Sequence, residues 1–210
     1  NKDYKGGRKP VRFNRRMIDL PEEEEAVNKG YQQVRLMEYL NHMPVIQLIA
    51  DYTEADDIIA HVVQSDYYDG WNKIIVSSDK DFFQLCDDDV SVYRPIQKKT
   101  LNKQSILEEF QIHPKNFALA RAIVGDKSDN LPGVKGAGLK TVAKRFPYLI
   151  REDVYEVSDI MRDCAMQGKK MKIHENIGNS EQLVKDNYKI MQLYYPNIRP
   201  INRAMIDKSI

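Results

Sequence analysis

Runs that favour buried strands occur only in the first half of this 210-residue sequence, and helical stripes fill the second half. Short apolar runs at 45–50, 73–77 and 90–94 alternate with helical stretches, an order typical of a parallel sheet with crossover helices. The expected helices of the first half are 22–42, 54–64 and 82–85. Those of the second half are 103–110, 114–124, 138–146, 154–166 and 180–188. We predict an α/β half joined to a helical half near residue 98.

The two halves carry opposite net charge. Residues 1–97 have 12 basic and 18 acidic side chains, whereas residues 98–210 have 20 basic and 13 acidic ones. An acidic half beside a basic half suits a cation site next to a surface that binds a polyanion. Ordinary solvated charge is the plainer alternative. The positions of the charged residues in the sequence have to distinguish between these two interpretations.

Cysteine content and hydropathy exclude two classes of protein. Cys86 and Cys164 are too few for a disulfide scaffold or a four-thiolate zinc site, and we interpret them as reduced thiols of a cytoplasmic protein. No apolar run approaches the roughly 18 residues needed to span a bilayer. We therefore expect no membrane partner.

Three groups of acidic residues mark the expected site. They are Glu54, Asp56 and Asp57; Asp79 and Asp81; and Asp126 and Asp129. The first two groups follow predicted strands, and ligands of open α/β sheets bind outside the carboxyl ends of strands. Oxygen donors without a His, Cys or Ser partner suit Mg²⁺ or Mn²⁺. The sequence predicts a metal site there.

Each acidic group also has a plainer explanation. The first is compatible with acids at a helix N-terminus, the second with loop acids, and the third with a turn stabilised by its own side chains. The coincidence of all three favours metal binding.

A glycine-rich hairpin lies between two predicted helices of the basic half. Its glycines and lysines are Gly133, Lys135, Gly136, Gly138, Lys140 and Lys144. Glycines let the backbone approach a phosphate closely, and the lysines add charge. The pattern is neither a Walker loop nor a dinucleotide fingerprint. We predict phosphate binding, with a tight interhelical turn as the alternative.

These motifs resemble those of the 5′-nuclease family, which includes flap endonucleases, the 5′-exonuclease domains of bacterial DNA polymerase I and bacteriophage RNase H. The matching segments are residues 54–57, 78–81 and 125–138, and the bacteriophage branch is the most similar. The resemblance implies a PIN-like parallel-sheet core within residues 1–98. It also implies a helical domain within 99–210 that carries a helix-hairpin-helix type of DNA-binding motif.

The resemblance also implies roles for individual residues. Asp56 and Asp79 would contact a first metal ion, with Glu54 and Asp57 close by, and Asp81, Asp126 and Asp129 would hold a second. Lys5 and Arg8, in a Tyr-Lys-x-x-Arg segment, would meet the scissile phosphate as catalytic residues. The hairpin residues would grip the duplex backbone, with K⁺ as a further ion there.

One departure from the family pattern concerns the N-terminus. Family members begin with a strand that carries an aspartate, whereas this sequence starts at the Tyr-Lys segment. We expect an N-terminal companion segment, covalently joined or supplied as a separate chain, to complete the sheet and the first metal site.

The expected function is therefore structure-dependent 5′-3′ exonuclease or flap endonuclease action. Its substrate would be duplex DNA with a 5′ flap or an RNA–DNA 5′ end, as in primer removal during replication, in the host cytoplasm if the source is viral. The alternative is a duplex-DNA-binding module, or a split-nuclease subunit, that catalyses nothing alone.

Overall fold

The structure, a computed structural model, describes residues 21–167 and 171–210. The elements of the first half are α1 (Glu22–Leu40), α2 (Ala55–Val63), η1 (Asp66–Tyr68), β1 (Lys73–Val76), η2 (Asp81–Leu85) and β2 (Val90–Arg94). They are followed by β3 (Lys99–Leu101), α3 (Lys103–Phe110), η3 (Pro114–Asn116), α4 (Phe117–Val124), α5 (Leu139–Arg145), η4 (Pro147–Ile150), α6 (Val157–Gln167), α7 (Lys172–Gly178), α8 (Glu181–Met191) and α9 (Pro200–Ser209). The predicted α/β class is confirmed.

The described sheet has three strands in the order β1-β2-β3. β1 and β2 are parallel, with Lys73 opposite Val90, as predicted. The prediction that strands end near residue 98 is wrong, because β3 pairs antiparallel with β2. Only residues 95–98 separate these two strands. A connection that short permits a hairpin but no crossover helix, so the sheet is mixed.

The predicted strand at 45–50 is also absent from the described part of the chain, and this prediction is wrong. Val45, Ile46 and Ile49 are 45%, 60% and 65% exposed, and no ladder includes them. An apolar run becomes a strand only when a neighbouring strand pairs with it, and no described strand does so.

Local sequence signals explain where the central helices begin and end. The side chain of Asn102 accepts a hydrogen bond from the backbone N–H of Ser105 at 2.9 Å and caps α3, as asparagine commonly does. Gly125, with φ of 74°, ends α4. Glycine tolerates this backbone conformation because it has no Cβ.

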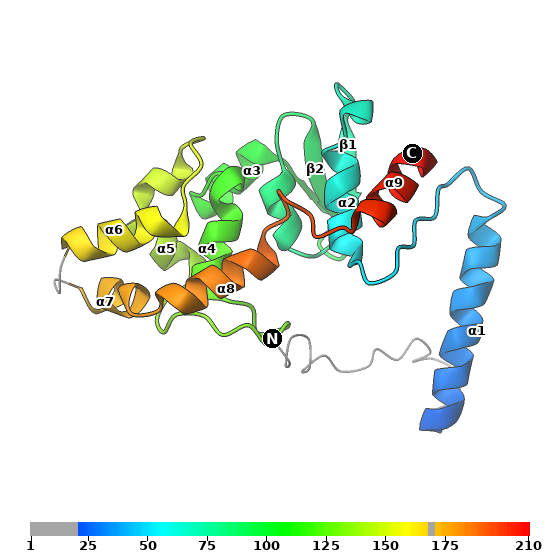
Figure 1. The fold of residues 1–210 in the computed structure, drawn as a ribbon, viewed down its shortest axis with the longest axis horizontal. Helices are drawn as coiled ribbons and strands as arrows, with labels where there is room; N and C mark the ends of the chain where they lie inside the picture. The colour runs from blue at the N-terminus through cyan, green and yellow to red at the C-terminus, as the bar shows by residue number, and fades with distance from the viewer. Residues whose placement is uncertain (1–20, 168–170) are drawn as a thin grey trace.

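One hydrophobic core runs through both halves of the chain, from Ala60 to Leu193. At its centre the rings of Phe83 and Phe117 meet edge to face, with centroids 5.4 Å apart. In Figure 1 the helical half extends to one side of the sheet, and α8 runs back along α4 toward it. The helical half therefore packs beside the sheet and shares one hydrophobic core with the strand half.

Two helices at the ends of the described chain behave differently. α9, which the sequence analysis missed, lies beside α2 (Figure 1), where Ile206 packs with Ile58. α1 was predicted, but it stands apart from the body (Figure 1), and Val27 and Tyr31 of its apolar stripe are 63% and 75% exposed.

None of the described helices has the length and apolar character that a membrane span needs.

Candidate active site

The first acid-bearing turn follows β1. A carboxylate oxygen of Asp79 accepts a hydrogen bond from the backbone N–H of Asp81 at 3.0 Å, and the Ser77 hydroxyl accepts one from the N–H of Asp79 at 3.1 Å. These bonds fold the chain from the strand directly into η2. Both aspartates therefore lie just beyond the carboxyl end of β1, as predicted.

The second acid-bearing turn follows α4. Asp126 and Leu131 exchange backbone hydrogen bonds of 2.9 and 2.7 Å, which close the turn. The carboxylate of Asp126 accepts two further bonds from Ser128, one from its backbone N–H and one from its hydroxyl. The side chain of Asp126 is therefore fixed by its own turn.

Gly125 and Gly133 permit the close backbone approach at this turn. A Cβ at Gly133 would lie 1.7 Å from the Val124 carbonyl oxygen, and one at Gly125 would lie 2.4 Å from the Gly133 nitrogen. Real Cβ atoms do not reach such distances. Gly133, predicted as part of the DNA-binding hairpin, is thus required to pack the end of α4 against the start of the hairpin.

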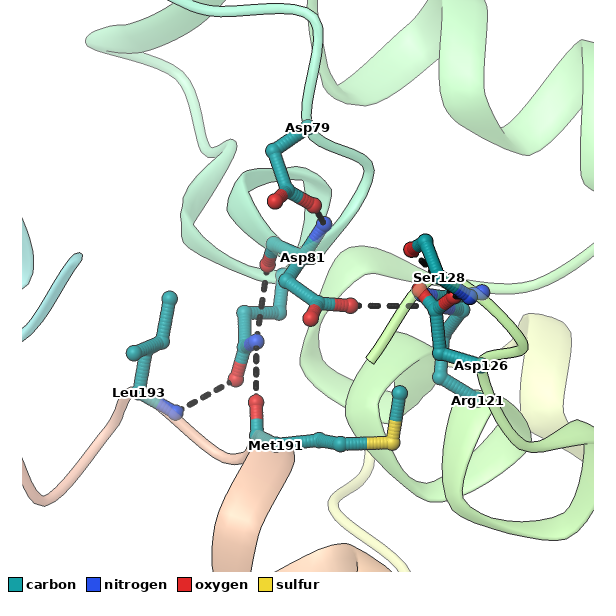
Figure 2. Close-up of polar contacts among 8 residues, drawn as sticks. Asp79, Asp81, Arg121, Asp126, Ser128, Met191 and Leu193 are labelled. Atoms are coloured by element: carbon teal, nitrogen blue, oxygen red, sulfur yellow. Dashed lines mark hydrogen bonds and ion pairs between the residues drawn. The ribbon is translucent and has the colours of Figure 1, made fainter. Parts of the chain in front are cut away.

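Arg121 joins the two acid-bearing turns. Its side chain is only 10% exposed. Its Nε donates to Oδ1 of Asp81 at 3.0 Å, and its Nη2 donates to Oδ2 of Asp126. Figure 2 shows the guanidinium and the two carboxylates facing one another, with Asp79 on the far side of Asp81. The sequence analysis did not identify Arg121.

The electrostatics of the two carboxylates differ. Burial raises the pKa of Asp81 to about 6; Arg121 opposes this shift and the charge of Asp79 adds to it. For Asp126, hydrogen bonds from Ser128 and Arg121 outweigh the effect of burial and lower its pKa. The pKa values of the two carboxyl groups are therefore shifted in opposite directions, by burial at Asp81 and by hydrogen bonding at Asp126.

A polar pocket of about 420 Å³ opens where the two turns meet. Its lining residues are Ser78, Asp79, Lys80, Arg121, Asp126 and Ser128. The pocket thus combines residues from the strand half and the helical half, and two of the predicted residues, Asp79 and Asp126, line it.

The acidic group at the start of α2 is placed differently. Glu54 is the N-cap residue of α2, with Asp56 and Asp57 in its first turn. The carboxylate of Asp57 accepts a hydrogen bond from the backbone N–H of Asn197 at 2.8 Å. Within residues 21–167 and 171–210, no group of three or more Asp, Glu, His or Cys side chains is arranged to hold a metal ion. The predicted convergence of all three acidic groups is therefore not formed by the described residues.

Asp129 is separate from the pocket lining. It is 6% exposed within the second turn. Lys5 and Arg8 lie outside the described residues.

The hairpin between α4 and α5 presents its lysines to solvent. Lys135, Lys140 and Lys144 are exposed, while Gly136 adopts φ of 85° at the tip. The side chain of Asn176 on α7 donates to the Lys135 carbonyl at 3.1 Å and supports the hairpin from behind. Gly138 directly precedes α5, which is only seven residues long. The lysines, rather than a long helix dipole, supply the positive charge here.

Comparisons with known proteins identify the family. Residues 1–111 match the family described as "5'-3' exonuclease, N-terminal resolvase-like domain". The chain is 37% identical over 115 residues to a 5′-3′ exonuclease of Buchnera aphidicola, covering 54% of this chain and 40% of that protein. It is 32% identical over 170 residues to DNA polymerase I of Streptococcus pneumoniae, covering 79% of this chain and 18% of the polymerase. The chain thus spans less than half the length of these relatives.

Solved structures agree on the fold. The 5′-exonuclease of bacteriophage T5, solved with zinc, superimposes with a TM-score of 0.73 at 22% identity, covering 99% of this chain and 75% of that one. A T5 flap endonuclease solved with DNA and metal ions superimposes with a TM-score of 0.68 at 23% identity, covering 92% and 68%. With the family match over more than half of its length, this chain belongs to the 5′-3′ exonuclease family of 5′ nucleases.

Proposed function

We propose that the chain carries the hydrolytic core of a structure-dependent 5′-3′ exonuclease or flap endonuclease. The observation that carries the proposal is that Arg121 joins Asp81 of one half to Asp126 of the other, beside a pocket lined by Asp79 and Asp126. Family membership supports the activity, and the T5 relative solved with DNA and metal ions supports a DNA substrate. The substrate would be a duplex with a 5′ flap or an RNA–DNA 5′ end.

The chemistry of the donors here suits a divalent metal ion, although their present arrangement around Arg121 does not form a metal site. Asp79, Asp81 and Asp126 offer carboxylate oxygens only, the ligands that Mg²⁺ and Mn²⁺ prefer. Burial is the main cause of the raised pKa of Asp81, and the charges of Asp79 and Asp126 add to it against the opposing effect of Arg121. We propose that these residues hold one of two ions, with Asp129 nearby, and that Glu54, Asp56 and Asp57 serve the other. When bound, such ions activate water and stabilise charge on phosphate oxygens.

The chain's own residues would prepare this pocket. Arg121 neutralises part of the charge of Asp81 and Asp126, and its place between them means that a metal ion would have to replace it as the counter-charge. Ser128 orients the carboxylate of Asp126 through two hydrogen bonds. Lys5 and Arg8 are proposed to contact the scissile phosphate.

The exposed lysines of the hairpin are proposed to hold the duplex. Lys135, Lys140 and Lys144 would contact backbone phosphates, while Gly136 and Gly138 allow close approach, with K⁺ as a further ion at this hairpin. Phosphate contacts position a duplex without reading its sequence. In this division of labour, residues 1–98 supply the nuclease core and residues 99–210 the DNA-binding domain.

A companion segment would complete the sheet. Ile74 and Val76 of β1 are 62% and 66% exposed. Among the described strands, β2 is the one neighbour of β1, which stands at the end of the order β1-β2-β3. Parallel strands normally have both faces and both edges covered. We propose that a further strand, joined to this chain or separate, pairs with β1 and brings ligands to the α2 acids. Adding such a segment should raise the melting temperature and the cleavage rate together.

The test uses the full-length protein that contains this chain, with Mg²⁺ and a duplex that bears a fluorescent 5′ flap. We expect labelled product that EDTA abolishes. Asp126→Asn should stop cleavage but leave gel retention of the duplex intact, while the exposed control Asp66→Asn should keep both. Retention by the unmodified protein without any cleavage would instead favour the non-catalytic DNA-binding module.

A further inference from the structure

The buried amide of Asn187 links α8 to the turn that carries Asp126. Asn187 is 2% exposed, and its Nδ2 donates to the carbonyl oxygens of Ala122 and Pro132, both at 2.9 Å. Ala122 follows Arg121 on α4, and Pro132 follows the residue that closes the Asp126 turn. One side chain thus fixes both ends of the second acid-bearing segment.

The buried amide of Gln84 links the same helix to the other turn. Gln84 is 1% exposed, and its Nε2 donates to the Asp81 carbonyl at 2.7 Å and to the Met191 carbonyl at 2.9 Å. Its Oε1 accepts from the Leu193 N–H at 2.7 Å. In Figure 2 dashed lines run from Asp81, Met191 and Leu193 to one side chain that lies between them, in agreement with these three bonds. The end of α8 is thus tied to the first acid-bearing turn.

Both links leave α8 from positions one helical turn apart. Asn187 and Met191 are separated by four residues, which places them on the same face, about 6 Å apart along the axis, and both are buried. Both amide N–H groups of each side chain donate a hydrogen bond, so these buried donors are satisfied and the two amides are fixed in orientation. The segment of α8 from Asn187 to Met191 therefore connects the two acid-bearing turns.

We infer that α8 is a positioning element for the nuclease reaction, and that Gln84 and Asn187 are positioning residues that set Asp81 and Asp126 relative to each other. The inference rests on the proposed function of the pocket. Neither side chain lines the pocket, so neither is expected to touch DNA. Their effect is on the alignment of carboxylates, to which catalysis is sensitive.

The test replaces each amide by an apolar side chain of similar size in the full-length protein, as Gln84→Met and Asn187→Leu. Gln182→Met is the matched control, because Gln182 lies on the exposed face of α8 and bonds only to Asp186 among its described partners. Each variant is assayed on the 5′-flap duplex at a temperature where circular dichroism shows it to be folded. Amide hydrogen exchange is measured in parallel at Asp126 and Leu131.

We expect kcat to fall about 10- to 100-fold in Gln84→Met and Asn187→Leu, with KM unchanged. The kcat of the double variant should be no lower than that of the poorer single variant, because both substitutions disrupt the same connection through α8. Exchange at Leu131 should accelerate in Asn187→Leu and stay unchanged in Gln182→Met.

Normal kcat in the folded variants, or failure of both variants to fold at any temperature, would overturn the inference and leave a purely structural role. If the unmodified protein cleaves nothing, the proposed function fails, and the hydrogen-exchange data alone then test whether α8 positions the Asp126 turn. Unchanged exchange at Leu131 in Asn187→Leu would then overturn this positioning role of α8.

Discussion

The two acidic regions of this chain differ in what surrounds them. Asp81 and Asp126 are held by a buried arginine, by their own turns and by α8 behind them. The acids at the start of α2 instead follow an apolar segment in which Val45, Ile46 and Ile49 are exposed. Within the residues that the structure describes, Asp81 and Asp126 are therefore brought together by this chain's own residues, whereas the α2 acids are not gathered into the same cluster.

Removing a pocket carboxylate should have the largest effect. Asp81→Ala in the full-length protein should lower the cleavage rate by about 1,000-fold or more, since it removes a charge that the transition state needs. Gel retention should show unchanged duplex affinity, and Asp66→Ala on an exposed helix provides the control. Near-normal turnover of Asp81→Ala would break the assignment of the pocket.

Removing the arginine should chiefly affect stability. Arg121→Met leaves two partly buried carboxylates without their counter-charge, which costs about 3 to 5 kcal/mol for a buried pair. Urea denaturation should show a lower midpoint, and Mn²⁺ should recover more of the loss in the variant than it adds to the parent protein. Equal stabilisation of both proteins by Mn²⁺ would mean that the metal and Arg121 do not share a position.

The raised pKa of Asp81 predicts a pH dependence of stability. Because the folded state binds this proton more tightly than the unfolded state does, the free energy of unfolding should fall as pH rises from about 4 to 7. The contribution of this one group is about 3 kcal/mol at most. Asp126, whose pKa is lowered, contributes in the opposite direction and loses its contribution as pH falls.

The difference between the unmodified protein and Asp81→Asn isolates this effect, because Asp126 remains in both. Denaturation curves at several pH values in EDTA should show a smaller decline above pH 4 for Asp81→Asn. An unchanged profile would contradict the raised pKa of the buried Asp81 carboxyl.

The smallest effect is expected at the hairpin. Lys135→Ala should weaken duplex binding by about 1 kcal/mol, equally for duplexes of different sequence, and should reduce the salt slope of log Kd by about one. Fluorescence anisotropy over a range of salt concentrations measures both. A sequence-dependent loss would show that the hairpin reads bases.

The sequence predicted the elements with strong periodicity and missed those that depend on neighbours. β1, β2, α2 and the central helices follow from hydrophobic period and caps. β3 has only three residues and arises from a hairpin, and 45–50 lacks a partner strand. Short strands are defined by pairing rather than by local preference.

The same reasoning applies to the site. Asp79 and Asp81 were predictable from their position after a buried strand, and Asp126 from its turn. Arg121 was missed, although a signal was present: it is the one charged residue in the apolar helix α4. A charge in such a helix is rarely buried unless it is paired. Gln84 and Asn187 gave no local signal, because the bonds that connect them to distant segments reach 107 and 109 residues for Gln84 and 65 and 55 residues for Asn187.

The central claim is that the pocket between the halves is a metal-dependent nuclease centre. Crystals of the full-length protein soaked in Mn²⁺ test it most directly, because anomalous scattering locates the ion independently of activity. We predict an anomalous peak in contact with Asp79, Asp81 and Asp126, with the Arg121 side chain turned away from the two carboxylates. A Mn²⁺ peak elsewhere, with Arg121 still bridging Asp81 and Asp126, would contradict the account.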